Sequence, residues 1–524
     1  MMAHSGARSG VSGVSNPPTT ETPETPDLAP VGLAELLAGI ANVPADVQVT
    51  DITLDSRNVS PGGLFLACRG LSSHGLQYLD RALAAGARAV LWEPTPGVEA
   101  PRLPASIFGL AVHELRSCVG LIADRFFDAP SARIRIAGVT GTNGKTTCCW
   151  LLAQALEASG RRGAYAGTLG VGPTAALKRT THTTPDCVSV HRELADLRAL
   201  GVRFLGMEVS SHALVQERVG GVRFDTAVFT NLSRDHLDYH KSMDAYADAK
   251  ARLFRLADVA HRVINMGDAA GRRLAAALPP TVPLTAVWTG VGEFRESSDS
   301  FLQARTVLAA SRGLEVEFES SWGAGRIGSR LIGEFNAENL IAVLAVLLLW
   351  DLPLAEAVRA LESATAPAGR METIGGRDGR PLVVVDYAHS PDALAKALRA
   401  ARKHCRGRLW CVFGCGGDRD SGKRPMMGAI AAELADKIIL TDDNPRTEDP
   451  QRIIDAIIEG FPGGEPVRVI RERARAIGTA LAEARADDVV LIAGKGHEDY
   501  QIYGTSPQPF SDRVEVERLL GAGA

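Results

Sequence analysis

Hydrophobic and polar positions alternate along the chain in blocks that predict strands followed by helices. Short apolar runs predict buried strands at 64–67, 89–92, 134–139, 204–209 and 226–230. Helical patterns lie between them, at 78–85 and from Lys145 onward. Strands that alternate with helices favour a largely parallel sheet covered by helices. The longest apolar run, 340–350, is too short to cross a bilayer, which takes about 20 residues, and therefore predicts a buried helix.

The residue composition changes along the chain and predicts a tail followed by three domains. Residues 1–30 are rich in Ser, Thr, Pro and Gly and bury too little apolar surface to become ordered, so we expect a disordered tail. A chain of 524 residues is too long for a single hydrophobic core. The patterns divide the rest into a small mixed domain, in which the segment 47–54 precedes the strand at 64–67, and two larger domains, with boundaries at 31–115, 116–366 and 367–524.

Four strands of the third domain each end in a polar loop. The strands are predicted at 382–385, 409–413, 437–440 and 489–493, and the loops at 386–389, 414–420, 442–446 and 494–498. Ser390 followed by Pro391 marks the start of a helix between the first two strands. Ligands of open α/β sheets bind outside the carboxyl ends of the strands, so four polar loops at one edge indicate a binding site.

Charge and cysteine content narrow the class of protein. The chain carries 57 Lys and Arg against 61 Asp and Glu, a net charge of −4, which argues against a dedicated nucleic-acid binder. No charged segment followed by an apolar stretch opens the chain, so no secretory signal is visible. Eight cysteines are scattered without a Cys-x-x-Cys pair, which favours free thiols in a reducing cytoplasm over a zinc site or disulfides.

A phosphate-binding motif lies between the strand at 134–139 and the helix that follows it. The segment 138–147 reads Gly-Val-Thr-Gly-Thr-Asn-Gly-Lys-Thr-Thr. Backbone N–H groups and the helix N-terminus can surround phosphate oxygens, Lys145 can reach the outer phosphates, and a Thr hydroxyl can bind Mg²⁺. The general motif requires Gly at 139, where Val stands, so this loop is a tighter Gly-x-x-Gly-Lys variant. A Gly-rich turn without a ligand is the alternative.

Further candidate residues follow the next strands. Glu208 ends a predicted buried strand, a position typical of a metal-binding acid in nucleotide hydrolases, although acids are common at strand ends. The strand after it is followed by carboxylates and imidazoles that suit a metal site or a solvated polar loop, namely Asp235, His236, Asp238 and His240. Lys250 lies in the next helix, and its sequence context alone favours a surface lysine.

The loops of the third domain carry their own chemistry. The turn Asp443-Asn444-Pro445-Arg446 combines carboxylate, amide and guanidinium groups, and Arg can bind a carboxylate with two hydrogen bonds. A capped turn with an exposed Arg is the alternative. The segment 414–420 could be a second anion loop or a tight turn, and 494–498 reads Gly-Lys-Gly-His-Glu.

These motifs, in this order, resemble the Mur ligase family of peptidoglycan synthesis, and the resemblance covers roughly residues 45–518. It implies an α/β fold of three domains. A small N-terminal α/β domain would bind UDP, a central domain with a parallel sheet and a P-loop-like motif would be the ATPase, and a C-terminal Rossmann-like domain would bring the incoming amino acid.

The resemblance also implies roles for individual residues. Catalysis is implied for Lys145, Glu208, His236 and Lys250, and metal binding for Thr146, Glu208, His236 and Lys250, the last as a carbamate formed with CO₂. ATP would contact Gly141, Thr142, Asn143, Gly144, Lys145, Thr146, Thr147, Asn336, Arg370 and Asp386. The UDP-linked muramoyl-dipeptide would contact Leu54, Ser56, Leu71, Ser72, Ser73, Thr183, Thr184, Ser210, Gln216 and Arg218. Diaminopimelate would contact Arg419, Asp443, Asn444, Pro445, Arg446, Gly494 and Glu498.

The implied reaction is ATP-dependent ligation of meso-2,6-diaminopimelate to the D-glutamate γ-carboxylate of UDP-N-acetylmuramoyl-L-Ala-D-Glu, through an acyl phosphate and with Mg²⁺. We expect a cytoplasmic monomer without membrane insertion or nucleic-acid partners. Lysine-adding family members resemble the chain but lack the Arg at 446. A folylpolyglutamate synthetase-like ligase would lack the UDP-binding domain, and a scaffold would bind nucleotide without ligation. The general base for the amine stays open between His389 and His497.

Overall fold

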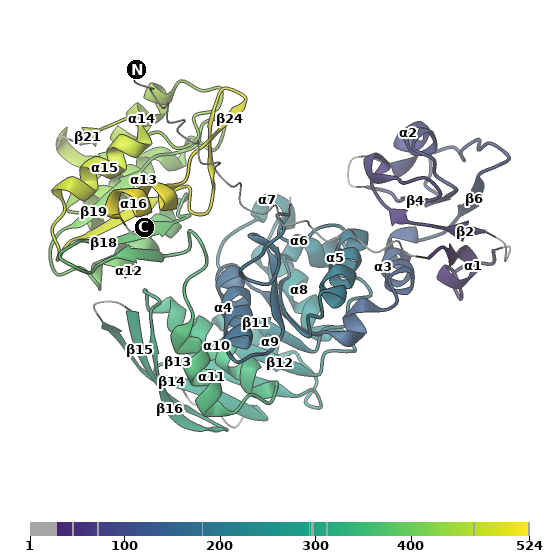
Figure 1. The fold of residues 1–524 in the computed structure, drawn as a ribbon, viewed down its shortest axis with the longest axis horizontal. Helices are drawn as coiled ribbons and strands as arrows, with labels where there is room; N and C mark the ends of the chain where they lie inside the picture. Colours follow the sequence, from purple (N-terminus) through teal and green to yellow (C-terminus); the bar gives the residue numbers. More distant parts are fainter. Residues whose placement is uncertain are drawn as a thin grey trace, which may run out of the picture.

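The computed structural model describes residues 29–43, 47–70, 73–180, 182–292, 294, 298–310, 313–464 and 467–521. The chain forms three units in sequence order, from the N-terminal unit at the right of Figure 1 through the central unit to the C-terminal unit at the upper left. The tail predicted at 1–30 lies outside the described residues, apart from 29 and 30.

The N-terminal unit is built on a parallel sheet in the order β3-β4-β5-β6. Helices cover both of its faces, with Leu64 and Leu66 packing toward α3, and Phe65 and Val90 toward α2. The elements are β1 (Val31–Gly32), α1 (Leu33–Leu36), β2 (Gln48–Val49), β3 (Ile52–Thr53), β4 (Leu64–Ala67), α2 (Leu79–Ala84), β5 (Ala89–Trp92), β6 (Phe108–Ala111) and α3 (Leu115–Phe126).

The central unit contains, in the described part of the chain, a sheet of ten strands in the order β16-β15-β14-β13-β12-β11-β7-β10-β8-β9. Its strands are β7 (Arg135–Thr140), β8 (Gly163–Gly167), β9 (Gly170–Gly172), β10 (Phe204–Glu208), β11 (Thr226–Phe229), β12 (His261–Asn265), β13 (Leu284–Thr289), β14 (Ser300–Ala310), β15 (Gly313–Ser320) and β16 (Gly323–Ser329). Its helices are α4 (Lys145–Ala158), α5 (Cys187–Ala199), α6 (Ser211–Val215), α7 (Leu237–His240), α8 (Met243–Ala251), α9 (Ala269–Ala276), α10 (Phe335–Leu349) and α11 (Leu354–Ser363).

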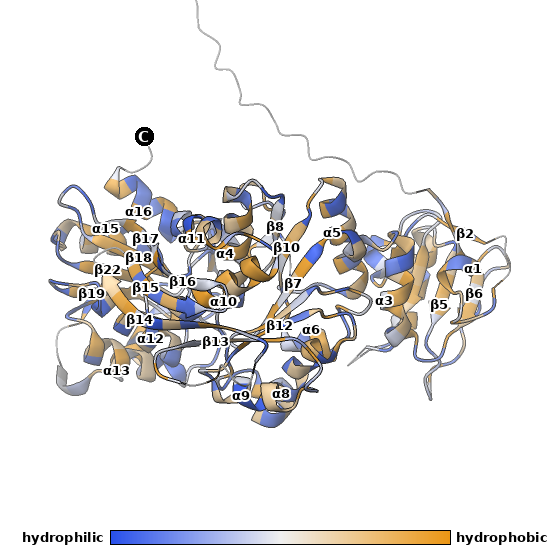
Figure 2. Cartoon of the chain, turned by 90° about the horizontal axis from the view of Figure 1, so that it is seen from below, coloured by the Kyte–Doolittle hydropathy of each residue, from blue (hydrophilic) through white to orange (hydrophobic). Residues whose placement is uncertain are grey.

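Two apolar cores lie on opposite faces of this sheet. Helices α4, α10 and α11 cover one face, and α5, α6, α8 and α9 cover the other. The predicted buried helix at 340–350 is confirmed as the larger part of α10, which is hydrophobic all round and drawn largely in hydrophobic colours in Figure 2. A helix enclosed on all sides in this way needs no polar face.

The C-terminal unit is built on the sheet β17-β18-β22-β19-β20-β21. Helices α12, α13 and α14 cover one face, and α15 and α16 the other. The elements are β17 (Glu372–Gly375), β18 (Leu382–Asp386), α12 (Pro391–Arg402), β19 (Leu409–Phe413), α13 (Lys423–Leu434), β20 (Lys437–Leu440), α14 (Pro450–Ile458), β21 (Arg468–Val469), α15 (Arg473–Glu483), β22 (Val489–Ala493), β23 (Tyr500–Tyr503), β24 (Ser506–Pro509) and α16 (Asp512–Leu520).

The predicted C-terminal strands are confirmed as β18, β19, β20 and β22, which run parallel, so their four polar loops share one edge of the sheet. The predicted helix start is also confirmed, because the Ser390 side chain accepts a hydrogen bond from the backbone of Ala393. No described helix is long and apolar enough to cross a membrane.

Two differences from the predicted elements have physical causes. The segment 47–54, continuous in the sequence pattern, is divided into β2 and β3, and the Asp51 carboxylate between them accepts hydrogen bonds from Ser60 and Arg192. The central sheet is parallel around β7 but ends in the antiparallel strands β14, β15 and β16, whose mixed apolar and polar residues gave no clear pattern.

Candidate active site

The Gly-rich loop at 141–144 connects β7 to the first residue of α4, as the phosphate-loop motif predicted. Gly141 has φ +154°, and a Cβ atom there would lie 1.9 Å from the Thr230 hydroxyl oxygen, so no larger residue fits. Asn231 holds the loop from the next strand: its carbonyl accepts the Thr142 N–H at 2.8 Å, and its side-chain oxygen accepts the Asn143 N–H at 3.0 Å. The loop is therefore fixed at the N-terminus of a 14-residue helix, where helix and backbone dipoles favour an anion.

Two lysine ammonium groups meet at this loop. The Nζ atoms of Lys145 and Lys250 donate hydrogen bonds to the carbonyl oxygen of Gly141 at 2.9 and 2.8 Å. Lys250 is only 1% exposed, so its interpretation as a surface lysine is wrong. Burial lowers the pKa of Lys145, and burial together with the Lys145 cation lowers the pKa of Lys250 well below its usual range. A bound anion would favour the charged form of the lysine beside it.

Glu208 is the last residue of β10, the strand that pairs with β7 in front of the phosphate loop. Its side chain is buried, with 1% exposed. Its Oε1 accepts hydrogen bonds from the Tyr165 hydroxyl and, at 3.0 Å, from the Thr168 backbone N–H. Its Oε2 accepts the Thr168 hydroxyl at 3.3 Å. A carboxylate held by several donors at a strand end is suited to bind a cation beside the phosphate loop.

His236 lies on the next loop, half-exposed, in a cluster of rings. Its Nε2 is 3.4 Å from an Asp235 carboxylate oxygen. Its ring centre is 4.9 Å from that of His212 and 6.1 Å from that of Tyr246, whose hydroxyl lies 3.3 Å from that of Thr142. The cluster brings His236 to the side of the phosphate loop.

The rest of the predicted histidine and aspartate cluster does not form a ready metal site. The Nε2 of His240 lies 2.9 Å from the Ser211 hydroxyl, and this histidine is buried against α6. The side chain of Asp238 lies outside the described part of the structure. Among the described side chains, no three His, Cys, Asp or Glu groups are arranged to hold a metal. A metal here would need ligands from a substrate as well.

Four of the residues predicted to hold the muramoyl-dipeptide form one hydrogen-bonded network beyond Glu208. The Thr184 hydroxyl donates to the Glu208 carbonyl at 3.0 Å and accepts the Ser210 N–H at 3.3 Å. Arg218 donates to the Thr184 carbonyl at 2.8 Å and to the Gln216 side chain at 2.7 and 3.0 Å. The network places a guanidinium group and hydroxyl groups at one end of the central sheet.

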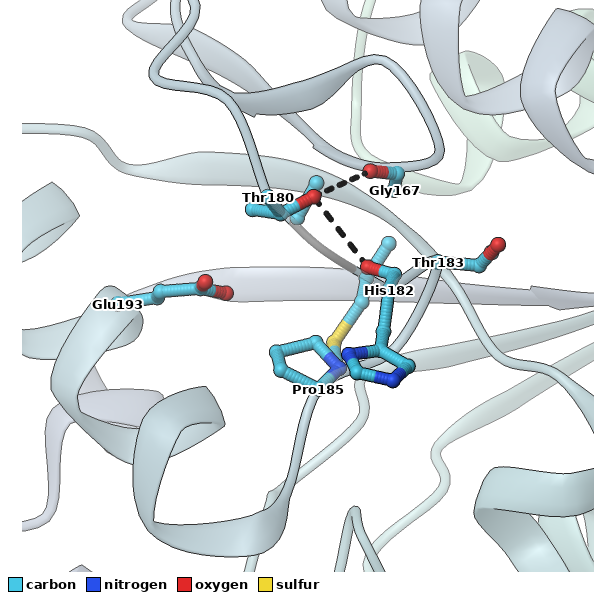
Figure 3. A pocket seen from close by; sticks show the side chains of 8 residues that line it. Gly167, Thr180, His182, Thr183, Pro185 and Glu193 are labelled. Atoms are coloured by element: carbon cyan, nitrogen blue, oxygen red, sulfur yellow. Dashed lines mark hydrogen bonds between the residues drawn. The ribbon is translucent and has the colours of Figure 1, made fainter. Parts of the chain in front are cut away.

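A hollow beside Thr183 adjoins this network. It is lined by Ala166, Gly167, Thr180, His182, Thr183, Pro185, Glu193 and Met207. Figure 3 shows the Thr180 hydroxyl bonded to the Gly167 and His182 carbonyls, and Glu193 extending from its helix toward the hollow. The Thr183 hydroxyl lies 3.1 Å from that of Thr168, which links the hollow to Glu208.

The predicted UDP contacts of the N-terminal unit follow neighbouring strands. Ser56 comes after β3 and is buried, and Leu54 beside it is half-buried. Ser73 comes after β4, and its carbonyl accepts the Gly70 N–H at 2.7 Å. Because β3 and β4 are parallel, these residues lie at one edge of the sheet. The predicted contacts at 71 and 72, Leu71 and Ser72, lie outside the described residues.

Other predicted nucleotide contacts are distributed around the loop. Asn336 is buried in α10 and accepts a hydrogen bond from Asn339 at 2.8 Å, and a Cβ atom at Gly144 would lie 2.5 Å from Asn339 Oδ1. The Asp386 carboxylate, at the end of β18, accepts two backbone N–H groups at 2.8 and 2.9 Å. Burial raises its pKa, against the lowering effect of the Arg370 cation.

Groups of the C-terminal unit lie close enough to the central site to affect its ionisation. Burial lowers the pKa of Lys145, and the Arg370 cation adds to this effect. Burial and Arg370 also lower the pKa of His497, against the opposing effects of Glu498 and Glu208. An ion pair between Arg179 of the central unit and Asp499 of the C-terminal unit joins the two units directly.

The predicted diaminopimelate residues gather at the shared loop edge of the C-terminal sheet. Arg446 is half-buried and donates to the Gly417 carbonyl at 2.9 Å. A Cβ atom at Gly416 would lie 3.0 Å from the Arg446 Nη1 and 3.7 Å from the Arg419 Cγ, so the two arginines flank this glycine. Arg419 is exposed. Two arginine side chains beside one glycine favour a carboxylate ligand.

The acidic half of this loop cluster lies deeper. Asp443 is 7% exposed, burial raises its pKa, and a Cβ atom at Gly494 would lie 2.3 Å from its Oδ2. The Asn444 amide donates to Glu498 Oε2 at 2.8 Å. Pro445 is buried within the same turn. Positive and negative groups thus lie on neighbouring loops, which suits an amino acid with both charges.

Sequence reasoning missed several residues that hold the predicted ones in place. Asn231 fixes the phosphate loop, Tyr165 and Thr168 hold Glu208, and Lys495 contacts both Asn444 and Glu498. Asn231 and Lys495 each follow a predicted strand, and this position in the sequence could have indicated that they lie near a site. Their partners Asn143 and Asn444 were not visible because these lie on other loops.

Family models match three segments of the chain. Residues 48–126 match the Mur ligase family catalytic domain, 139–347 the Mur ligase middle domain, and 369–496 the Mur ligase glutamate ligase domain. The chain is similar to two proteins named UDP-N-acetylmuramoyl-L-alanyl-D-glutamate--2,6-diaminopimelate ligase. That of Pseudomonas aeruginosa is 47% identical over 91% of this chain and 96% of its own length. That of Alkalilimnicola ehrlichii is 48% identical over 91% and 95%.

Solved structures give the same picture. A structure of a protein with that same ligase name is 36% identical, covers 94% of this chain and 99% of its own, and superimposes with a TM-score of 0.70. A Mycobacterium tuberculosis folylpolyglutamate synthase shares the fold at 18% identity and a TM-score of 0.56, over 72% of this chain and 92% of its own.

We predict that Glu193, in the hollow of Figure 3, makes stability depend on pH. Burial raises its pKa from the usual 4.5 to about 7, against the lowering effect of Lys178. The folded protein keeps a proton here that the unfolded chain releases, so the free energy of unfolding should fall as pH rises through this range. Urea unfolding at about pH 5 and about pH 8 should show a smaller fall for Glu193→Gln.

The matched control is Glu99→Gln, at an exposed glutamate of the N-terminal unit, which should keep the pH dependence of the unaltered protein. An identical pH dependence for Glu193→Gln and the unaltered protein would contradict the assignment.

Proposed function

The chain belongs to the Mur ligase family, and from this premise we propose the reaction that it catalyses. It joins meso-2,6-diaminopimelate to the D-glutamate γ-carboxylate of UDP-N-acetylmuramoyl-L-Ala-D-Glu, at the expense of ATP and through an acyl phosphate. The observation that carries the ATP-dependent chemistry is the convergence of Lys145 and Lys250 on the Gly141 carbonyl. The ligases that share this name supply the substrates.

The three proposed domains divide the substrates among them. Residues 31–115 would hold the UDP moiety, 116–366 the ATP, and 367–524 the incoming amino acid. Because the ATP and amino-acid sites lie on different sheets, the reaction needs both sheets to face one cleft. The effects of Arg370 on Lys145 and of Glu208 on His497 support this arrangement.

In the first step, an oxygen of the D-glutamate γ-carboxylate attacks the γ-phosphorus of ATP, and the bond to the β-phosphate oxygen breaks to release ADP. The chain supplies positive charge where negative charge accumulates: the Lys145 ammonium group and the N-terminus of α4. Arg218, held by Thr184 and Gln216, would hold the substrate carboxylate group in position.

In the second step, the amine of diaminopimelate attacks the acyl phosphate carbon, a tetrahedral intermediate forms, and phosphate leaves. The amine must lose protons on the way. His389 and His497 both lie on the loop edge of the C-terminal sheet, and His497 has a lowered pKa that keeps it neutral and able to accept a proton. We leave the base open between the two.

Magnesium fits the residues at the phosphate loop. Mg²⁺ commonly takes one or two carboxylates, with substrate phosphates and water as its remaining ligands. The buried Glu208 carboxylate, the Thr146 hydroxyl and the His236 imidazole would be the protein's share, which agrees with the lack of a three-residue metal cluster among the described side chains. The ion would neutralise phosphate charge during transfer.

The acceptor is the substrate that the C-terminal loops would select. The guanidinium groups of Arg419 and Arg446 would hold the distal carboxylate of diaminopimelate, and Glu498 its distal ammonium group. Lysine has no distal carboxylate and would leave Arg446 without its partner, so a lysine-adding reaction is disfavoured. A folylpolyglutamate synthetase-like ligase would lack a UDP-binding domain, so the N-terminal sheet disfavours a folylpolyglutamate-adding reaction.

We also propose that Lys250 becomes a carbamate. Its neutral amine, which burial and the Lys145 cation favour, is the form whose nitrogen attacks the carbon of CO₂ and then releases one proton. The product is an anion, which attracts the Lys145 cation and adds a carboxylate-like ligand at the metal site. The eight free cysteines support activity in the reducing cytoplasm. The monomeric state expected from the sequence stays a prediction.

The acceptor assignment predicts that Arg446→Ala loses activity with diaminopimelate by raising the KM for this amino acid, on the order of a hundredfold or more. The loss should be small with lysine, which cannot use the guanidinium group. The assay measures phosphate release in the presence of ATP, Mg²⁺ and the UDP-linked dipeptide. Diaminopimelate, lysine or a folate serves as the variable acceptor, so the loss of activity is obtained for each acceptor.

Arg468→Ala is the matched control, because Arg468 pairs with Glu483 on the exposed surface of the same domain. It should retain full activity. If the unaltered protein used lysine alone as acceptor, the proposed substrate would be wrong.

The carbamate predicts that Lys250→Ala loses activity on the order of 10² to 10³, typical for removal of one charged group at a reacting centre. Formate or acetate, which can occupy the space of the missing carboxylate, should restore part of it. Steady-state assays with and without these acids measure the rescue.

Lys396→Ala, at an exposed lysine that pairs with Asp392, should keep its activity and should not respond to the acids. Failure of every short acid to rescue Lys250→Ala, while the variant still binds Mg²⁺ and ATP, would count against carbamate formation.

A further inference from the structure

Lys495 is a fully buried lysine to which the reaction described above gives no role. It lies on the turn after β22, and its side chain is 0% exposed. Its Nζ donates to Glu498 Oε2 at 2.9 Å and to Asn444 Oδ1 at 3.2 Å. Placing an ammonium group out of water is unfavourable unless good partners surround it, so these contacts need a reason.

The contacts form a closed ring that ties two loops together. The Asn444 amide donates to the same Glu498 Oε2 at 2.8 Å, and the Asn444 oxygen also accepts the Ile502 N–H at 3.0 Å. The turn at 443–446 and the segment 494–502 are therefore held in one register. Arg446 belongs to the same arrangement, because its backbone N–H donates to the Ile502 carbonyl at 3.0 Å.

The ring leaves one oxygen of Glu498 unused. Both donors address Oε2, and no described residue donates to Oε1. The Glu498 side chain keeps 15% of its surface exposed, whereas the lysine beneath it has none. A carboxylate held by one oxygen and open at the other is oriented to receive a donor from a ligand.

Another buried pair of the same domain differs in this respect. Arg473 binds both oxygens of Asp512 at 2.7 Å, and neither side chain is exposed. That pair is closed to any ligand, and its role is to join α15 to α16. Lys495 uses the opposite arrangement, with one carboxylate oxygen fixed and the other left free.

We propose that Lys495 is a positioning residue for the acceptor amino acid: it orients the Glu498 carboxylate and the Asn444 amide that meet the distal head of diaminopimelate. The inference rests on the proposed function and deepens it. Lys495 acts through Glu498 and touches neither ATP nor the reacting atoms. It therefore sets the KM for the acceptor and leaves kcat and the KM for ATP unchanged.

The test is the steady-state kinetics of the full-length Lys495→Met protein with diaminopimelate and ATP varied in turn. Loss of a charge-assisted hydrogen bond predicts an increase of about tenfold or more in the KM for diaminopimelate. An unchanged KM for diaminopimelate, or a fall in kcat with no change in KM, overturns the inference.

A double variant separates positioning from a purely structural role. If Lys495 acts through Glu498, then Lys495→Met with Glu498→Gln should have the same KM for diaminopimelate as Glu498→Gln alone. Multiplication of the two single effects would overturn the inference. Lys495→Met leaves a buried carboxylate unpaired and could fail to fold for that reason. The double variant removes both charges together, so it should fold even if Lys495→Met does not.

Arg402→Met is the matched control. Arg402 binds Asp436 at 2.7 Å and the Leu434 carbonyl at 3.1 Å, at the opposite edge of the same sheet. Its loss should leave every kinetic constant unchanged.

The unaltered protein, assayed alongside, separates failure of the proposed function from failure of the positioning role of Lys495. If it forms no product with diaminopimelate, the proposed function fails, and if it does while Lys495→Met matches it, only the positioning role fails.

Discussion

The central constraint in this molecule is that two buried lysine side chains share one backbone carbonyl oxygen. Lys145 comes from the first turn of α4 and Lys250 from α8, and both donate to Gly141 within 3 Å of its oxygen. Burial is the main reason why the pKa values of both are lowered; the Arg370 cation adds to the effect on Lys145, and the Lys145 cation adds to the effect on Lys250. The arrangement becomes favourable when an anion arrives, so the loop is prepared for a polyphosphate before one binds.

The rest of the site is organised around that positive centre. Glu208 is placed beside it by the parallel pairing of β10 with β7, and Tyr165 and Thr168 hold its carboxylate. The C-terminal sheet then presents its loop edge, with Arg370 near Lys145. One sheet thus activates an acid, and the other presents an amine. Joining the two requires a shared cleft rather than any unusual residue.

Most of the framework could be predicted from the sequence, because strand ends and Gly-rich turns are local signals. The phosphate loop, the strand ends after β18, β19, β20 and β22, and the buried α10 all follow from short patterns. The burial of Lys250 could not, since its helix has no marked apolar face and its partner lies 109 residues away. Lys495 was missed for the same reason, because it contacts a turn 51 residues away. The antiparallel strands β14 to β16 were missed because their alternation is broken by glycine and charge.

The most direct test of this account is the calorimetric titration of ATP with Mg²⁺ into the unaltered protein and into Lys145→Met. If the Lys145 ammonium group creates the anion site, the unaltered protein binds the nucleotide, and the folded variant binds it about tenfold or more weakly. Equal affinity of the two proteins would contradict the account.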